Sequence, residues 1–186
     1  HLRGMFAFLI WDTKAQRLFA ARDRLGIKPL YWAETPHGLI LGSELKALLA
    51  SGYIRPELNL EALNYYLAFY SVPTPLTMLA GAHALPPGHH LSWDADTKRV
   101  DVRQYWDVPP ARPIRADETE IRNELRRLLE ESIRLRMIAD VPVGAFLSGG
   151  VDSSAVVGLM TRIAGERLKT FSIGFEDEGR RIDERS

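Results

Sequence analysis

The stretch FLSGGVDSS, residues 146–154, decides the fold of the C-terminal part of the chain. The apolar run 143–147 predicts a short buried strand that leads into it, and residues 152–163 predict the helix that follows. A second apolar run, 169–175, predicts another strand. Strand, loop, helix and strand in this order are typical of a βαβ unit with a parallel sheet, so we expect an α/β fold here.

The loop between this strand and this helix has the composition of an anion site. Two glycines let a ligand approach the backbone, and the helix N-terminus offers N–H groups and a positive dipole end. The hydroxyls of Ser148, Ser153 and Ser154 can donate to phosphate oxygens. Asp152 would repel phosphate unless a Mg²⁺ ion lies between them, because Mg²⁺ takes one or two carboxylates together with phosphate oxygens. The residues predict a Mg²⁺–phosphate site; the alternative is a tight turn whose Ser and Asp only cap the helix.

Composition excludes several classes of protein. The 186 residues are 46% hydrophobic, enough for a core in one or two small domains. The 24 Lys and Arg balance the 24 Asp and Glu, which argues against a general nucleic-acid surface. The absence of Cys excludes a disulfide framework and a thiol nucleophile within these residues. No apolar run reaches the ~18 residues that span a bilayer and no signal peptide is visible, so we expect no membrane and a cytoplasmic protein.

The first part of the chain predicts an antiparallel, β-rich α+β fold. Residues 5–12 (MFAFLIWD) predict a buried strand, and 17–22 the strand that returns. A second strand pair, 30–33 and 39–41, precedes a short helix with Ser43 as its N-cap.

The middle of the chain predicts one helix, two short strands and a linker. Asn59 can cap a helix that runs to about Tyr70. The aromatic residues Tyr65, Tyr66, Phe69 and Tyr70 are expected to serve in helix packing. A proline-rich linker follows the strands, before a long helix capped by Asp117 or Thr119. The expected divisions are residues 1–55, 56–112 and 113–186.

The motifs resemble those of a known family. SGGVDSS (148–154) is similar to the pyrophosphate loop of the ATP pyrophosphatases, and the whole chain resembles the glutamine-hydrolysing asparagine synthetases. In that family a class II glutamine amidotransferase domain precedes a synthetase domain. Similar to the second half of the first domain are RGMFAFLIWD (3–12), ARDRLGIKPLYW (21–32) and GSELKALL (42–49). Similar to the start of the second domain are DVPVGAFLSGGVDSSAV (140–156) and KTFSIGFED (169–177).

The resemblance implies a carbon–nitrogen ligase of asparagine biosynthesis. ATP and Mg²⁺ would activate aspartate as an acyl-adenylate, pyrophosphate would leave, and ammonia from glutamine would displace AMP. It implies that the pyrophosphate and Mg²⁺ contacts fall on Ser148, Gly149, Gly150, Asp152 and Ser153, with Asp152 as the metal-linked acid. It also implies that the backbones of Leu147 and Ile173 face the adenine and ribose. The partners that the resemblance implies are aspartate, glutamine and ATP. It also suggests that the full protein could form a homodimer.

The amidotransferase nucleophile of this family is an N-terminal Cys, so no catalytic residue is assigned within this chain. Because the sequence begins at His1 without an initiator Met, we expect a fragment of a longer enzyme that is inactive alone. Two alternatives stay open. One is a related enzyme that amidates another carboxylate or closes a β-lactam ring. The other is a non-catalytic nucleotide-binding module.

Several other polar groups have weaker assignments. Three histidines are expected to be surface or connector residues rather than metal ligands, and Glu44 an acid at a helix start. The charges around Gly26 could form an ion-pair network or lie at a domain interface. An acidic cluster after the last strand could contact a second Mg²⁺ or remain a solvated loop. These sets are His83, His89 and His90; Arg22, Asp23, Arg24 and Lys28; and Glu176, Asp177, Glu178, Asp183 and Glu184.

Overall fold

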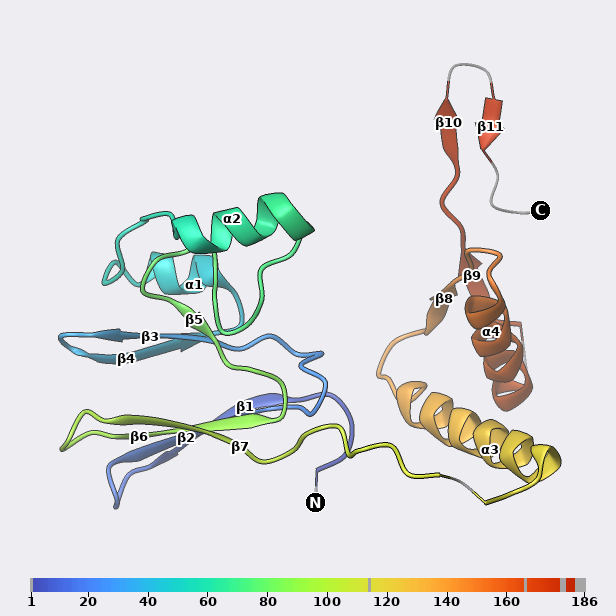
Figure 1. Ribbon diagram of the computed structural model, residues 1–186, viewed down its shortest axis with the longest axis horizontal. Helices are drawn as coiled ribbons and strands as arrows, with labels where there is room; N and C mark the ends of the chain where they lie inside the picture. The colour runs from blue at the N-terminus through green and yellow to red at the C-terminus, as the bar shows by residue number, and fades with distance from the viewer. Residues whose placement is uncertain (1, 114, 166, 178–179, 183–186) are drawn as a thin grey trace. The chain divides into compact units, whose positions relative to one another are not determined.

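The computed structural model describes residues 2–113, 115–165, 167–177 and 180–182, and side chains as far as Gly174. The chain divides into two compact units, His1–Pro110 and Ala111–Ser186. Figure 1 labels the elements of both units.

The first unit is built on a four-stranded antiparallel sheet with the strand order β1-β2-β6-β7. Its strands are β1 (Ala7–Asp12), β2 (Arg17–Arg22), β6 (His89–Asp94) and β7 (Val100–Gln104). The β1–β2 turn closes because the Asp12 carboxylate accepts the N–H groups of Lys14 and Ala15, at 2.8 and 2.9 Å. Asp94 closes the β6–β7 turn in the same way through Asp96 and Thr97. The hairpins join where Ala20 lies opposite Leu91.

A three-stranded sheet and two helices complete this unit (Figure 1). The sheet order is β4-β3-β5, with β3 (Tyr31–Thr35), β4 (Gly38–Gly42) and β5 (His83–Ala84). The helices are α1 (Leu45–Ala50) and α2 (Leu60–Phe69). One core cluster joins Ala20 and Leu91 of the four-stranded sheet to Leu30 and Leu85, which lie next to β3 and β5. A second cluster, Ala33, Leu48, Leu79 and Ala82, includes a residue of α1. The predicted antiparallel α+β architecture is confirmed.

Helix α2 begins as predicted and α1 does not. The Asn59 side chain accepts the N–H groups of Glu61 and Ala62, at 3.1 and 3.2 Å. For α1, the prediction of Ser43 was wrong: Glu44 is the N-cap and makes no side-chain cap bond. The difference is geometric, because a cap side chain works only when its residue directly precedes the first helical turn.

We expect Asn59→Ala to lower the free energy of unfolding by about 1 kcal/mol, since two N–H groups at the start of α2 lose their acceptor. Urea unfolding followed by fluorescence measures the change. Asn64→Ala, within the same helix but away from its cap, is the control. An equal loss in both variants would contradict the capping role.

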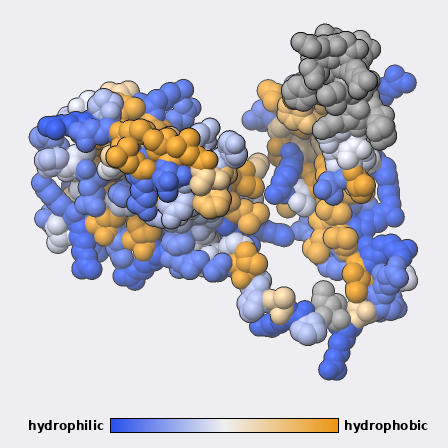
Figure 2. Space-filling model, turned by 45° about the horizontal axis from the view of Figure 1, so that its top comes forward, coloured by the Kyte–Doolittle hydropathy of each residue, from blue (hydrophilic) through white to orange (hydrophobic). Residues whose placement is uncertain are grey.

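Two apolar segments of this unit have exposed side chains. Strand β1 is an edge strand, and its Leu9, Ile10 and Trp11 side chains are 49%, 55% and 43% exposed. On α2, Phe69 and Tyr70 at its C-terminus are also exposed. The prediction of a buried β1 was wrong, and the aromatic packing on α2 is seen between Tyr65 and Phe69, whose stacked rings have centroids 6.3 Å apart. An apolar pattern shows which residues are suited to packing but not which layer lies beside them. Figure 2 shows such hydrophobic side chains at the surface of this unit.

The second unit contains the predicted parallel pair. Strands β8 (Gly144–Phe146) and β9 (Lys169–Phe171) flank α4 (Val151–Ala164) and pair in parallel, with Phe146 opposite Phe171. The second strand is shorter than the predicted 169–175, and β10 (Phe175–Asp177) and β11 (Arg180–Ile182) form a separate antiparallel pair.

The long helix α3 (Glu118–Arg136) packs against α4. Asp117 caps α3 in a capping box with Glu120, which decides between the two predicted caps. Among the described residues, no helix combines the length and apolar character needed to cross a membrane.

Candidate nucleotide-binding site

The loop that leads from β8 into α4 turns on two glycines. Gly149 has a φ of +87°, a left-handed conformation that favours glycine because any side chain would be strained there. Gly150 then occupies the N-cap of α4 in extended conformation and supplies no side-chain cap. The first N–H groups of α4 therefore have no capping side chain, at the helix end where the dipole favours negative charge.

Two serine hydroxyls meet across this loop. The Oγ atoms of Ser148 and Ser153 lie 3.2 Å apart, and the Ser153 hydroxyl donates to the carbonyl of Gly150 at 3.1 Å. The Gly150 N–H in turn donates to Ser148 Oγ at 3.4 Å. The structure thus brings Ser148, Gly150 and Ser153, three of the residues singled out from the sequence, together in one hydrogen-bonded loop.

The ends of the two parallel strands lie side by side below the loop. The N–H of Leu147 donates to the carbonyl of Phe171 at 2.8 Å, and the carbonyl of Leu147 accepts the Ser172 hydroxyl at 2.6 Å. Ile173 follows directly and its side chain is exposed. The predicted residues Leu147 and Ile173 therefore lie on neighbouring strand ends. Sequence reasoning missed Ser172, although a hydroxyl directly after an apolar strand is a signal that could have marked it.

Asp152 lies in the first turn of α4 and is the acidic residue of that turn. The described residues contain no group of three or more His, Cys, Asp or Glu side chains placed to hold a metal ion. A single carboxylate fits Mg²⁺ that arrives with phosphate oxygens and water rather than an ion held by protein alone. The acidic cluster Glu176, Asp177, Glu178, Asp183 and Glu184 lies outside the residues whose side chains the structure describes.

A separate polar centre holds the turn after β2 in the first unit. The Asp23 carboxylate is 1% exposed and accepts N–H groups from Phe6, Leu25, Ile27 and Lys28, at 2.9 to 3.3 Å. Burial by itself would raise the pKa of Asp23, but these backbone donors outweigh it and lower the pKa below its usual value.

The Arg22 guanidinium binds backbone carbonyl groups of the same turn and that of Leu85. It donates to the carbonyls of Gly26, Lys28 and Leu85, at 2.7, 2.8 and 2.6 Å. Gly26 has a φ of +67°, a left-handed conformation that glycine adopts without strain. Asp23 and Arg22 thus bond to backbone groups, and the two polar side chains hold the turn.

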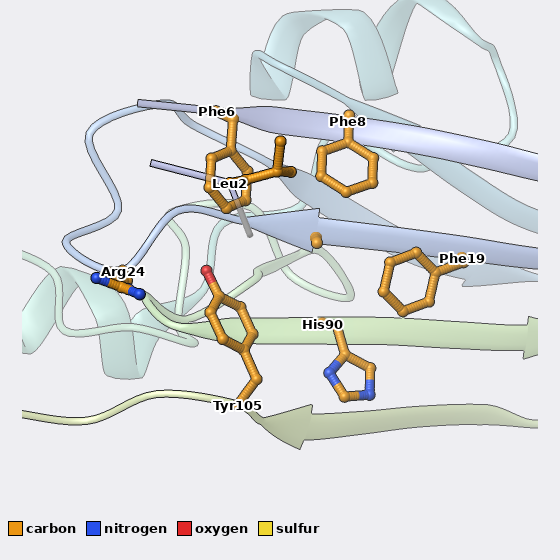
Figure 3. Close-up of a pocket in the computed structure, with 8 residues that line it drawn as sticks. Leu2, Phe6, Phe8, Phe19, Arg24, His90 and Tyr105 are labelled. Atoms are coloured by element: carbon orange, nitrogen blue, oxygen red, sulfur yellow. The ribbon is translucent and has the colours of Figure 1, made fainter. Parts of the chain in front are cut away.

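A cavity of about 270 Å³ lies on the face of the four-stranded sheet that carries Phe8, Ala21 and His90 (Figure 3). These residues alternate with the core residues Ala20 and Leu91, so the cavity lies on the opposite face from the core. Its other lining residues are Leu2, Phe6, Phe19, Arg24 and Tyr105.

Two polar groups of this cavity, the Tyr105 hydroxyl and the Arg24 guanidinium, already have partners. The Tyr105 hydroxyl donates to the carbonyl of Arg22 at 2.6 Å, and Arg24 lies over the ring of Trp106 at 5.8 Å. Burial and the negative charge of Asp23 raise the pKa of Tyr105, so its hydroxyl keeps its proton at neutral pH. The cavity is therefore mainly an aromatic surface and offers no activated nucleophile.

The three histidines have separate surroundings. His83 packs on Trp32 with ring centroids 4.7 Å apart, and His89 Nδ1 lies 2.7 Å from the carbonyl of Pro87. His90 lines the cavity beside Phe19. Each is thus accounted for by packing or by a local hydrogen bond.

Comparison with known proteins finds two families along the chain. Residues 1–106 match the glutamine amidotransferase domain family, and residues 124–186 match the asparagine synthase family. A putative asparagine synthetase [glutamine-hydrolyzing] 2 of Methanocaldococcus jannaschii is 40% identical over 176 residues, covering 93% of this chain and 34% of the relative. Asparagine synthetase [glutamine-hydrolyzing] 1 of Bacillus subtilis is 39% identical over 179 residues, covering 96% of this chain and 28% of the relative.

A third relative has a different name. Amidase chyE of Penicillium rubens is 35% identical over 194 residues, covering 96% of this chain and 28% of the relative. The chain thus spans about a third of the length of the curated relatives that it matches.

Proposed function

Since the chain belongs to the glutamine amidotransferase domain family and its C-terminal part matches asparagine synthase, we propose that it is part of an ATP-dependent carbon–nitrogen ligase. The enzyme would convert aspartate to asparagine in the cytoplasm with ammonia from glutamine. An acyl-adenylate of aspartate would form with release of pyrophosphate, and attack by ammonia would release AMP. We assign the whole first unit, His1–Pro110, to the amidotransferase part, rather than only residues 1–55 with a connector at 56–112, because strands β6 and β7 pair in the same sheet as β1 and β2 and the family match extends to residue 106. The start of the synthetase domain (113–186) follows it.

One observation carries this proposal: the serine- and glycine-lined loop at the carboxyl end of the parallel pair β8–β9, which opens helix α4. Ligands of open α/β sheets bind at this edge, and a helix N-terminus stabilises an anion. Backbone N–H groups and hydroxyls gathered at such a loop are suited to bind the phosphate oxygens of a nucleotide.

The residues at and beside the loop have three different roles in this proposal. Ser148, Gly149, Gly150 and Ser153 would hold the pyrophosphate portion of ATP, because they supply the hydroxyls and the open backbone. The Asp152 carboxylate would hold Mg²⁺, which when bound neutralises phosphate charge. The backbones of Leu147 and Ile173 would face the adenine and ribose from the two strand ends.

Glutamine hydrolysis needs a group that these residues lack. The 186 residues contain no Cys, so the thiol that attacks the glutamine amide has to come from elsewhere in the full polypeptide. We therefore expect these residues alone to be inactive in glutamine hydrolysis. We expect them to be inactive in the synthetase half-reaction as well, because the chain spans only about a third of the length of its relatives.

A second candidate keeps the ATP chemistry and changes the carboxylate. The relatives named amidase chyE and amidase chry2 cover 96% and 99% of this chain, at 35% and 36% identity. Their names differ from that of the asparagine synthetases, which supports an enzyme of this architecture with a substrate other than aspartate. A β-lactam ring-closing enzyme is a further form of this candidate. A non-catalytic nucleotide-binding module is the third candidate.

Substrate dependence separates these candidates. The full polypeptide that carries this chain is assayed for AMP and pyrophosphate release from ATP and Mg²⁺, with glutamine or an ammonium salt as the nitrogen source. We expect release with aspartate and at least ~100-fold less with glutamate, because an acceptor longer by one methylene displaces its reacting carboxylate. Turnover with other acids only would favour the second candidate. No turnover with any acid would favour the nucleotide-binding module.

A further inference from the structure

The parallel ladder between β8 and β9 ends with a side chain in place of a backbone donor. Phe146 lies opposite Phe171, and the Leu147 N–H donates to the Phe171 carbonyl at 2.8 Å. In a regular parallel ladder the next rung runs from the N–H of Ile173 to the carbonyl of Leu147. Here the Ser172 hydroxyl donates to that carbonyl instead, at 2.6 Å.

Because the Ser172 hydroxyl takes the place of the Ile173 N–H at this carbonyl, the Ile173 N–H is left without its ladder partner. Within the described residues the Ile173 N–H has no hydrogen-bond partner, and its residue is exposed where the strand ends. An exposed N–H at the carboxyl end of a parallel strand is placed to donate to a ligand. The acceptors on a nucleoside that suit such a donor are the ring nitrogens of adenine and the oxygens of ribose.

The same hydroxyl fixes the entrance to the glycine loop. Leu147 directly precedes Ser148, and both of its backbone polar groups are bound by residues 171 and 172. The position of the loop relative to Ile173 therefore depends on this contact. A nucleotide that spans both places, with phosphates on the loop and base at the strand ends, needs this separation to be constant.

We propose that Ser172 is a positioning residue for the nucleoside part of ATP: its hydroxyl takes the carbonyl of Leu147 and so leaves the Ile173 N–H to the ligand. The inference rests on the proposed function of the loop. Removing the hydroxyl frees the carbonyl of Leu147, and the Ile173 N–H closes the next rung of the ladder. The fold then exchanges the side-chain hydrogen bond of Ser172 for a backbone hydrogen bond from Ile173, whereas the nucleotide loses the Ile173 N–H as a donor.

Ser172→Ala in the full polypeptide tests this role. We expect the KM and Kd for ATP to rise roughly fivefold, the weight of one hydrogen bond, while kcat and Tm stay close to wild type. The affinity for inorganic pyrophosphate, measured by calorimetry, should stay unchanged because pyrophosphate contacts only the loop. Ser172→Thr keeps a hydroxyl and should restore ATP binding, and Thr170→Ala on the same strand is a matched control.

Four outcomes would overturn the proposal. They are wild-type ATP affinity in Ser172→Ala, an equal loss of ATP and pyrophosphate affinity, a Ser172→Thr variant as weak as Ser172→Ala, and a large fall in Tm that marks a structural role. A wild-type protein that binds ATP without aspartate-dependent turnover counts against the proposed function alone. A wild-type protein that binds no ATP overturns both.

Discussion

Asp152→Asn should lower aspartate-dependent pyrophosphate release by at least ~100-fold, the scale of losing charge stabilisation at a transferring phosphate. The amide keeps the size of the carboxylate and removes its charge, at the first turn of α4. Without that charge, Mg²⁺ loses its proposed protein ligand beside the loop hydroxyls. The helix itself should persist, because the interaction with the helix dipole is worth only about 0.5 kcal/mol at an exposed site.

The matched control is Glu118→Gln, at the first turn of α3 in the same unit. It removes one negative charge from a helix start that has no glycine loop, so activity should remain within about twofold, as for a typical surface change. Calorimetry gives a second readout: the Mg²⁺-dependent part of ATP affinity should disappear in Asp152→Asn alone. Normal Mg²⁺-dependent binding in this variant would exclude Asp152 as the metal-linked acid.

Asp23→Asn should lower the free energy of unfolding of the first unit by about 3 kcal/mol or more, because buried backbone N–H groups lose a carboxylate acceptor. The carboxylate accepts backbone N–H groups with both oxygens, whereas an amide presents one oxygen and an NH₂ that faces N–H donors. Those donors come from the start of β1 and from the turn after β2. All four tryptophans of the chain lie within His1–Pro110, so urea unfolding followed by Trp fluorescence reports on this unit.

The pH dependence of unfolding checks the charge of Asp23. Its pKa in the folded chain lies below the usual value of 3.8, so its stabilising effect is complete above pH 3.8 and is lost as the pH falls through the folded pKa. Asp23→Asn should therefore flatten the acid limb of the stability curve. Asp101→Asn, an exposed partner of Arg103 on β7, is the control and should cost less than about 1 kcal/mol. An acid limb unchanged by Asp23→Asn would contradict this account.

The sequence predicted the order of elements in the second unit for a local reason, although the strand that was expected to be buried is exposed at Phe146. The strand β8, the paired glycines Gly149 and Gly150 and the helix α4 are contiguous, and each is marked by its own sequence pattern. The role of Asp23 was harder to foresee. A run of Arg, Asp, Arg and Lys suggests ion pairs, whereas its partners are backbone N–H groups that no residue letter reveals.

Exposure depended on neighbours that a local pattern does not identify. The apolar run of β1 predicted a strand correctly. That strand is exposed because it pairs with β2 on one side only and so lies at the edge of the sheet. Ser172 was missed because its importance arises from the register of β8 and β9. The hydroxyl matters only where it replaces the next backbone donor of the ladder.

The pairing of β2 with β6 also sets an order of events during synthesis of the chain. Arg17 pairs with Asp94, so the two hairpins of the four-stranded sheet join only after the intervening segment has been made. Closing so long a loop carries an entropic cost that local hairpins avoid, and non-local pairing slows folding. A ribosome therefore presents β1 and β2, with their aromatic side chains uncovered, well before β6 emerges. This interval is when the nascent chain is most exposed to aggregation, and when a chaperone would have most to protect.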